Sequence, residues 1–176
     1  MKRFFIFLTA TIFIIAIDQL TKWLVKNSFH HNETKVIIDG LFNLTYIRNP
    51  GAAFGFLANA HDAIRKPFLF ILPVGACVFL LLLFKQVWKK NIILEIAYTL
   101  IFAGAVGNLI DRFFMNYVVD FLDFYFKEHH FPAFNVADSS ISIAVGFLFW
   151  DLLIVSRKRV QVLRQESEDV PDDGFE

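Results

Sequence analysis

Four long apolar runs constrain what this chain can fold into more than any other feature. They cover residues 4–25, 67–85, 92–112 and 138–156, and each is close to the roughly 20 residues that a helix needs to cross a bilayer. Apolar residues make up 56% of the 176 positions, above the ~45–50% of soluble domains. The sequence therefore predicts an all-α membrane protein, with four transmembrane helices in one domain over residues 1–160.

The first run has an alternative interpretation as a secretory signal, because Lys2 and Arg3 precede its hydrophobic stretch. No small-residue cleavage site follows it, however, and apolar residues at helical spacing continue past Asp18 to Val25. We therefore interpret this run as the first membrane helix.

The distribution of lysine and arginine predicts how the helices are oriented. The cytoplasmic flanks of membrane helices carry an excess of these residues. If both termini are cytoplasmic, nine of the 17 basic residues fall in short inner flanks: Lys2, Arg3, Lys85, Lys89, Lys90, Arg157, Lys158, Arg159 and Arg164. Both termini are therefore expected to be cytoplasmic, and the longer loops at 26–66 and 113–137 are expected outside.

One of these outer loops carries a strand pattern. Apolar and polar residues partly alternate from Phe42 to Ile47, which is typical of a short strand, and Asn49-Pro50-Gly51 then indicates a turn. We expect a small extracytoplasmic β element near residues 36–57, resting on the outer face of the membrane.

The end of the chain has no apolar pattern. Residues 161–176 are rich in charge and contain Pro171 and Gly174, and such segments bury too little apolar surface to fold. A solvated, disordered cytoplasmic tail without a chemical role is expected there.

Charge and residue content exclude several classes of function. The net charge of +0 gives no electrostatic basis for a nucleic-acid partner. Cys77 is the single cysteine, which excludes an internal disulfide and a cysteine-rich zinc site. The five histidines lack the HExxH spacing of zinc peptidases, and Ser139, Ser140 and Ser142 have no base nearby in the sequence. No metal or cofactor is expected.

Charged residues inside the runs need a reason, because each costs about 2.5–3.5 kcal/mol to insert. Asp18 and Lys22 are spaced i,i+4 in the favourable order, which predicts a structural ion pair. Asp111 beside Arg112 predicts a second pair. Gly104 lies on the same helical face as Asp111, and its small size favours close helix packing in lipid.

Asp120 and Asp138 do not fit this structural pattern. Asp120 lies in the loop after the third run, and Asp138 lies where the fourth helix should begin, so that it could serve simply as an N-cap. Eighteen residues separate the two, enough for the loop to return to the same end of the bundle. Two carboxylates in one apolar site do not both ionise easily, so one keeps its proton while the other acts as a base. This pair is therefore a candidate for activating water against an amide.

Two other functions use similar residues. A proton- or ion-coupled transporter also carries intramembrane carboxylates, but a relay needs them near the midplane, whereas Asp120 and Asp138 are expected at one interface. A non-enzymatic membrane scaffold would use all the charges as ion pairs, and it would tolerate Asp120→Asn.

Five blocks of sequence, in this order and spacing, resemble lipoprotein signal peptidase (signal peptidase II). They are Asp18-Gln19-Leu20-Thr21-Lys22, Asn49-Pro50-Gly51-Ala52-Ala53-Phe54-Gly55, Gly104-Ala105-Val106-Gly107-Asn108-Leu109-Ile110-Asp111-Arg112, Val118-Val119-Asp120-Phe121 and Phe131-Pro132-Ala133-Phe134-Asn135-Val136-Ala137-Asp138. The resemblance runs from about residue 18 into the fourth helix. Its one departure is Ala103 before Gly104, where many members have two glycines.

The resemblance implies a role for each matched residue. Asp120 and Asp138 would form the catalytic dyad of an aspartic endopeptidase. Six residues would line the substrate site: Asn49, Gly51, Phe54, Asn108, Arg112 and Asn135. Four others would support the fold: Asp18, Lys22, Gly104 and Asp111.

The resemblance also implies a substrate and a location. The family removes the signal peptide of bacterial prolipoproteins and cuts just before a cysteine that carries diacylglycerol. The expected partners are therefore this lipidated precursor and membrane lipid, without a cofactor or nucleic acid, and a monomer is expected. The expected location is the bacterial cytoplasmic (inner) membrane, with the active site near its outer face.

Overall fold

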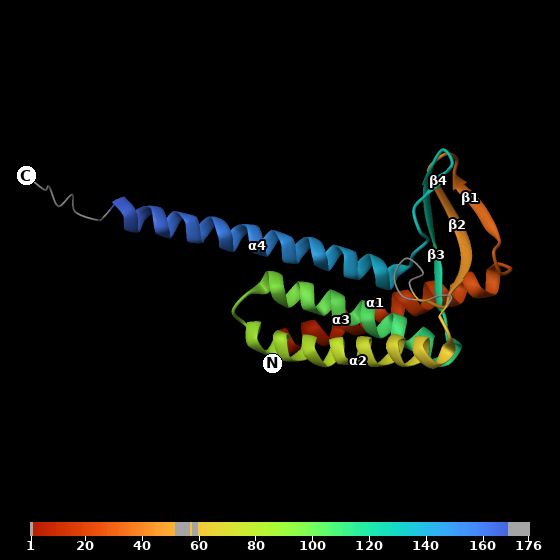
Figure 1. Cartoon of the computed structure of the whole chain (residues 1–176), viewed down its shortest axis with the longest axis horizontal. Coiled ribbons are helices and arrows are strands. Elements are labelled where there is room, and N and C mark those ends of the chain that lie inside the picture. The colour runs from red at the N-terminus through yellow and green to blue at the C-terminus, as the bar shows by residue number, and fades with distance from the viewer. Residues whose placement is uncertain (1, 52–56, 58–59, 169–176) are drawn as a thin grey trace, which may run out of the picture.

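The computed structural model describes residues 2–51, 57 and 60–168, and the side chains of residues 3–51, 57 and 60–155. It contains four long helices: α1 (Lys2–Ser28), α2 (Asp62–Val87), α3 (Ile92–Met115) and α4 (Val136–Glu168). Each includes a segment long and apolar enough to cross a membrane. The helices run alongside one another, and a small sheet stands at one end of them (Figure 1). The prediction of four membrane helices is confirmed.

The sheet has four antiparallel strands in the order β1-β2-β3-β4. They are β1 (Thr34–Ile38), β2 (Phe42–Asn49), β3 (Val118–Phe126) and β4 (His129–His130). The first two strands confirm a β element near the predicted range 36–57, although it begins at Thr34; residues 52–56 of that range lie outside the described residues.

The interpretation of residues 113–137 as a loop is wrong, because β3 and β4 lie within it. Val118–Phe126 is rich in β-branched and aromatic residues, which favour strands. It pairs with β2, where Arg48 lies opposite Val119. Such a pairing joins segments about 70 residues apart, so the local pattern alone did not indicate the partner strand.

Two predicted helix ends are also corrected. Helix α2 begins at Asp62 rather than 67, because the His61 side chain accepts a hydrogen bond from the Ala63 backbone N–H and caps the helix. Helix α4 continues to Glu168 rather than ending at 156, so the first half of the expected tail, 161–168, is helical. This stretch has neither Gly nor Pro and consists mostly of helix-forming residues. The remainder, 169–176, lies outside the described residues.

Helix α3 lies very close to two other helices where it carries glycine. A Cβ atom at Gly104 would lie 2.6 Å from Ser140 Oγ of α4, and one at Gly107 would lie 2.7 Å from Asp18 Oδ2 of α1. Both distances are too short for non-bonded atoms, so any side chain larger than that of glycine would force the neighbouring groups to move. The glycines therefore bring α1 and α4 to the same stretch of α3, as close helix packing in lipid requires.

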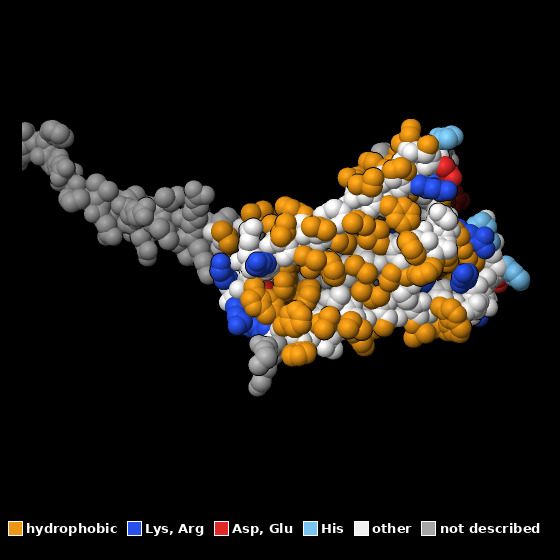
Figure 2. Space-filling model, turned by 90° about the horizontal axis from the view of Figure 1, so that it is seen from below, with side chains coloured by type: hydrophobic (Ala, Val, Ile, Leu, Met, Phe, Trp, Pro, Cys, Tyr) orange, Lys and Arg blue, Asp and Glu red, His pale blue; other side chains and the backbone are white. Residues whose placement is uncertain are grey.

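The sheet is attached to the helices through a small core. Val25 of α1 packs against Tyr46 of β2 and against Val119 and Phe121 of β3. This contact fixes the position of β3 relative to α1. The sides of the helices, by contrast, are covered with apolar side chains, and the basic side chains gather at the two ends of the molecule (Figure 2).

Candidate active site

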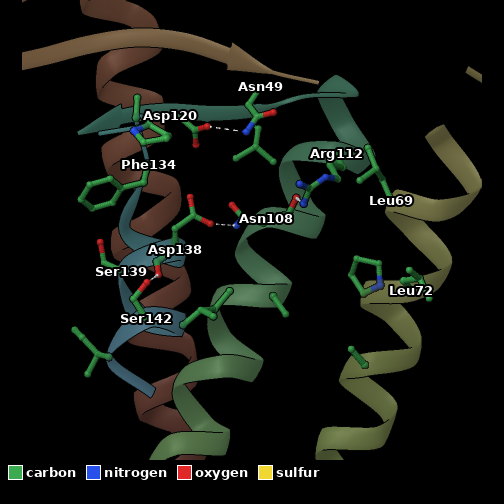
Figure 3. A pocket seen from close by; sticks show the side chains of 18 of the residues that line it. Asn49, Leu69, Leu72, Asn108, Arg112, Asp120, Phe134, Asp138, Ser139 and Ser142 are labelled. Carbon is green, nitrogen blue, oxygen red and sulfur yellow. Dashed lines mark hydrogen bonds between the residues drawn. The ribbon is translucent and has the colours of Figure 1, made fainter. Parts of the chain in front are cut away.

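A cavity of about 870 Å³ lies between α2, α3 and α4, next to the sheet. Most of its wall is apolar, with Leu69, Leu72 and Pro73 from α2 and Ile141 from α4. Its polar lining residues are Asn49, Asn108, Arg112, Asp120, Asp138, Ser139 and Ser142. Figure 3 shows that Asp120 and Asp138 approach this space from different elements, β3 and α4, with Asn108 of α3 beside them.

Asp120 is held in the cavity by two amides. Asp120 is only 3% exposed. Its carboxylate accepts hydrogen bonds from Asn49 Nδ2 at 3.0 Å and from Asn135 Nδ2 at 2.7 Å. Burial, together with the nearby charge of Asp138, raises the pKa of Asp120 to about 7. A carboxyl group with this pKa exchanges its proton near neutral pH.

Asp138 is the third residue of α4 and is oriented by the start of that helix. Its Oδ1 accepts from Asn108 Nδ2 at 2.8 Å, and its Oδ2 accepts from the backbone N–H of Asn135 at 3.3 Å. In return, Asn135 Oδ1 accepts from the Asp138 backbone N–H at 2.9 Å. This reciprocal pair is a capping box. The interpretation of Asp138 as an N-cap is therefore wrong, because Asn135 caps the helix and leaves the Asp138 carboxylate facing the cavity.

Asn135 also links the two carboxylates. It is fully buried, and besides Asp120 its Nδ2 lies 3.3 Å from both Asn108 Oδ1 and the Val119 carbonyl oxygen. Since Asn108 donates to Asp138, a chain of amides runs from one aspartate to the other. Within the described part of the protein, no lysine, arginine or histidine forms an ion pair with either aspartate.

A network of buried charges, joined to the chain of amides at Asn108, centres on Lys22. Its ammonium contacts Asp18 Oδ2 at 2.8 Å and Asp111 Oδ2 at 3.0 Å, and it donates to Asn108 Oδ1 at 2.9 Å. All three charged side chains are at most 3% exposed. The predicted pair between Asp18 and Lys22 is confirmed. The predicted pair between Asp111 and Arg112 is wrong, because Asp111 pairs with Lys22 across two helices.

The same network holds the backbone next to each cavity aspartate. Asp18 Oδ1 accepts from the backbone N–H of Ala137 at 2.9 Å, one residue before Asp138. Asp111 Oδ2 accepts from the backbone N–H of Val119 at 3.1 Å, one residue before Asp120. One lysine therefore contacts both of the carboxylates that hold the backbone of α4 and β3.

Gln19 completes this network and was assigned no role from the sequence. Its Nε2 lies 3.0 Å from Asp111 Oδ1, 3.1 Å from the Gly107 carbonyl oxygen and 3.2 Å from Asp18 Oδ2. Its position between Asp18 and Lys22, in a block that matches the family, is the sequence feature that could have indicated this role. The apolar wall of the cavity was missed too, because its residues look like any others in an apolar run.

Arg112 lines the cavity and donates hydrogen bonds to backbone oxygens. It donates to the Gly51 carbonyl oxygen at 3.0 Å and to that of Asn108 at 3.4 Å, while Asn49 Oδ1 accepts from the Gly51 N–H at 2.9 Å. Three predicted substrate-site residues, Asn49, Gly51 and Arg112, are thus brought together. Phe54, the fourth from this region, lies outside the described residues.

Histidines do not contribute to this cavity. His130 of β4 contacts Asp123 of β3 at 2.9 Å, and neither lines the cavity. Among the residues that the structure describes, no group of three His, Cys, Asp or Glu side chains is arranged to hold a metal ion.

The sequence is similar to those of a known protein family. A family model described as signal peptidase (SPase) II matches residues 10–154. A lipoprotein signal peptidase of Syntrophus aciditrophicus (strain SB) is 42% identical over 152 residues, which span 86% of this chain and 94% of that protein. One of Desulforapulum autotrophicum is 47% identical over 132 residues, 75% of this chain and 82% of its own length.

Solved structures are similar as well. Two are described as bacterial membrane enzymes. One superposes with a TM-score of 0.72 at 28% identity and covers 97% of this chain and 94% of its own. The other has a TM-score of 0.69 at 32% identity and covers 84% and 92%. The similarity thus extends over the membrane helices and the sheet.

Proposed function

Because the chain belongs to the signal peptidase II family, membrane proteases that remove the signal peptides of prolipoproteins, we propose that it works as an aspartic endopeptidase with Asp120 and Asp138 as its dyad. The observation that carries this proposal is the environment of the two carboxylates. They share the polar end of an otherwise apolar cavity and are hydrogen-bonded by neutral amides rather than by cations.

In the proposed reaction, the ionised aspartate accepts a proton from a water molecule while that water attacks the scissile carbonyl. The protonated partner donates a hydrogen bond to the developing oxyanion and then a proton to the leaving amine. The raised pKa of Asp120, about 7, supports a pair that holds one proton between them at neutral pH. The pair titrates as a unit, so the two roles are assigned to the dyad rather than to single residues.

Neighbouring residues would align the substrate. Asn49 and Asn135 orient Asp120, and Asn108 orients Asp138, through the hydrogen bonds described above. Arg112 lines the cavity and is bonded to the Gly51 carbonyl oxygen, and the backbone of an extended substrate would pass beside it. The apolar walls from α2 and α4 suit a signal peptide that enters sideways from the lipid.

The proposed substrate is a prolipoprotein whose cysteine carries diacylglycerol, cut immediately before that cysteine. Each CH₂ group in the hydrocarbon is worth about 0.8 kcal/mol, so two acyl chains hold the cysteine at a constant depth. The sheet end of the bundle carries the dyad, and we assign this end to the outer face of the bacterial cytoplasmic membrane. The nine basic residues of the inner flanks support this orientation.

The experiment compares a lipidated precursor peptide with the same peptide bearing an unmodified cysteine, both with the purified protein in one detergent. The lipidated peptide should be cut far faster, with the difference in kcat as well as KM, because depth controls alignment at the dyad. A metal chelator should leave the rate unchanged. Equal rates for the two peptides would instead favour a general signal peptidase, and loss of activity on chelation would favour a metal mechanism.

A further inference from the structure

A second, smaller cavity of about 230 Å³ lies near the opposite end of the bundle from the sheet. Helices α1 and α3 form its walls, together with Phe84 of α2. On α1 its lining runs from Arg3 to Ile14, which corresponds to about 16 Å along a helix that rises 1.5 Å per residue. The cavity is therefore an elongated groove rather than a compact pocket.

The groove is mainly apolar, and its rim is exposed near the end that holds Arg3. Phe7 and Phe84 meet with their ring centroids 4.2 Å apart and line the groove. On its rim, Ile6 is 67% exposed and Ile92 is 55% exposed, so nothing in the described protein covers them. An extended acyl chain has the shape and chemistry that this groove accepts.

A cation lies at the terminal end of the groove. The Arg3 side chain is 48% exposed, and its contact with Glu95 Oε1 is long, at 3.5 Å. Glu95 is buried and also accepts a hydrogen bond from the Lys89 backbone N–H, so its carboxylate does not depend on Arg3 alone. A guanidinium has five N–H donors, which leaves Arg3 able to bind an anion while it keeps this contact.

The surroundings of Arg3 are positively charged. Lys85, Lys89 and Lys90 are exposed around the turn between α2 and α3, and Figure 2 shows basic side chains gathered at this end beside the apolar side of the bundle. Among the side chains that the structure describes, the acidic ones here are the buried Glu95 and the half-buried Asp151, which accepts a hydrogen bond from Asn91 Nδ2 at 2.7 Å. The positive charge around Arg3 therefore attracts an anionic headgroup, and it stabilises a zwitterionic headgroup much less.

We propose that this groove is a binding site for one anionic phospholipid, with an acyl chain along the groove and the phosphate at Arg3. All bilayer lipids offer an acyl chain, so selectivity comes from the headgroup. A basic residue near the membrane surface favours an anionic lipid roughly fivefold. The site is distinct from the catalytic cavity, with which it shares none of its lining residues.

The test uses Trp88 as the reporter, because its ring centroid lies 5.1 Å from that of Phe84 in the groove wall. The variant Trp23→Phe/Trp150→Phe retains Trp88 alone among the three tryptophans. This variant is reconstituted into two kinds of phosphatidylcholine vesicle. One contains a small fraction of phosphatidylglycerol brominated on its acyl chain, and the other contains the same fraction of brominated phosphatidylcholine. Brominated phosphatidylglycerol should quench Trp88 as if it were about fivefold enriched over brominated phosphatidylcholine.

Two further variants separate the groove from the general surface charge. In Arg3→Gln the preference for phosphatidylglycerol should fall to near one, and in Ala10→Phe, which fills the groove, bromine of either lipid should quench Trp88 less. Lys26→Gln, an equal charge change near the sheet end of α1, should leave the preference intact. Equal quenching by the two lipids in the parent protein, or an unchanged preference in Arg3→Gln, would overturn the proposal.

Discussion

Four of the buried or cavity-facing aspartates near the sheet fall into two pairs with different surroundings. Asp18 and Asp111 share one buried cation, Lys22, and each holds a backbone N–H of a neighbouring element. Asp120 and Asp138 face a cavity and are hydrogen-bonded mainly by asparagine amides. The first pair therefore contacts a cation and holds the scaffold, whereas the second pair is hydrogen-bonded by neutral donors and faces the space that a substrate could enter.

The two pairs depend on each other. The backbone groups that Asp18 and Asp111 hold belong to Ala137 and Val119, the residues before Asp138 and Asp120. The charged pair therefore fixes the backbone beside the other pair, and with it the separation of Asp120 and Asp138. A change in the Lys22 network should alter stability first and catalysis through alignment, while a change in the cavity pair should alter catalysis directly.

Removal of the shared cation should have the largest effect on stability. Lys22→Met leaves Asp18 and Asp111, both about 1% exposed, without their counter-ion, and the loss of one partner of a buried pair costs about 3–5 kcal/mol. Thermal unfolding in detergent should show a strongly lowered Tm. The control is Lys26→Met, one turn further along α1 and exposed; if both variants unfolded at the same temperature, the network would have no structural weight.

A smaller loss is expected where α1 approaches α3. Gly107→Ala would bring a Cβ atom to 2.7 Å from Asp18 Oδ2, and such overpacking costs about 1–3 kcal/mol. Gly75→Ala in α2 is the matched control, because nothing lies within 4 Å of its Cβ position. It should be neutral or slightly stabilising, since alanine favours helix over glycine. Equal behaviour of the two variants would contradict a tight contact at Gly107.

The pKa of Asp120 predicts a dependence of stability on pH. Because this pKa is about 7 in the folded protein against an ordinary value near 3.9, the unfolded chain releases the proton first. Stability from this group is present below about pH 4 and is lost as the pH rises to about 7. The Tm of Asp120→Asn minus that of the parent should therefore increase from pH 4 to pH 7. A constant difference would show that burial does not disfavour the charge.

Substitution of Asp151 should have the smallest effect, because this aspartate belongs to neither of the two pairs. It accepts a hydrogen bond from Asn91 at 2.7 Å and lies outside both networks near the sheet. Asp151→Asn retains an acceptor oxygen for Asn91. We therefore expect a free energy of unfolding within about 1 kcal/mol of that of the parent and unchanged cleavage of the lipidated peptide. A large loss of activity would mean that aspartates far from the cavity also take part.

Much of this arrangement could be predicted from the sequence. The spans follow from apolar runs of membrane-crossing length, and the pair Asp18 and Lys22 follows from a local i,i+4 spacing on one helix. Both are properties of contiguous residues. The blocks that match the family also predict Asp120 and Asp138 as site residues, and both line the cavity.

The rest depends on contacts between distant segments. The partner of Asp111 is Lys22 rather than its neighbour Arg112, because adjacent helical residues point in different directions. Strand β3 needs β2 to pair with, and the capping role passes from Asp138 to Asn135 because the helix begins at Val136. Helix α4 continues to Glu168, beyond its apolar segment Val136–Val155, whereas polarity alone indicates a tail there.

The central claim is that the counter-ion separates the aspartates that hold the fold from those that react, and four matched substitutions test it in one assay. Asp18→Asn, Asp111→Asn, Asp120→Asn and Asp138→Asn are compared for turnover of the lipidated peptide and for Tm. The cavity variants should lose about 10²–10⁴-fold in kcat without a lower Tm, while Asp18→Asn and Asp111→Asn should unfold at lower temperature and retain measurable turnover below it. Near-normal turnover by Asp120→Asn or Asp138→Asn would contradict the claim.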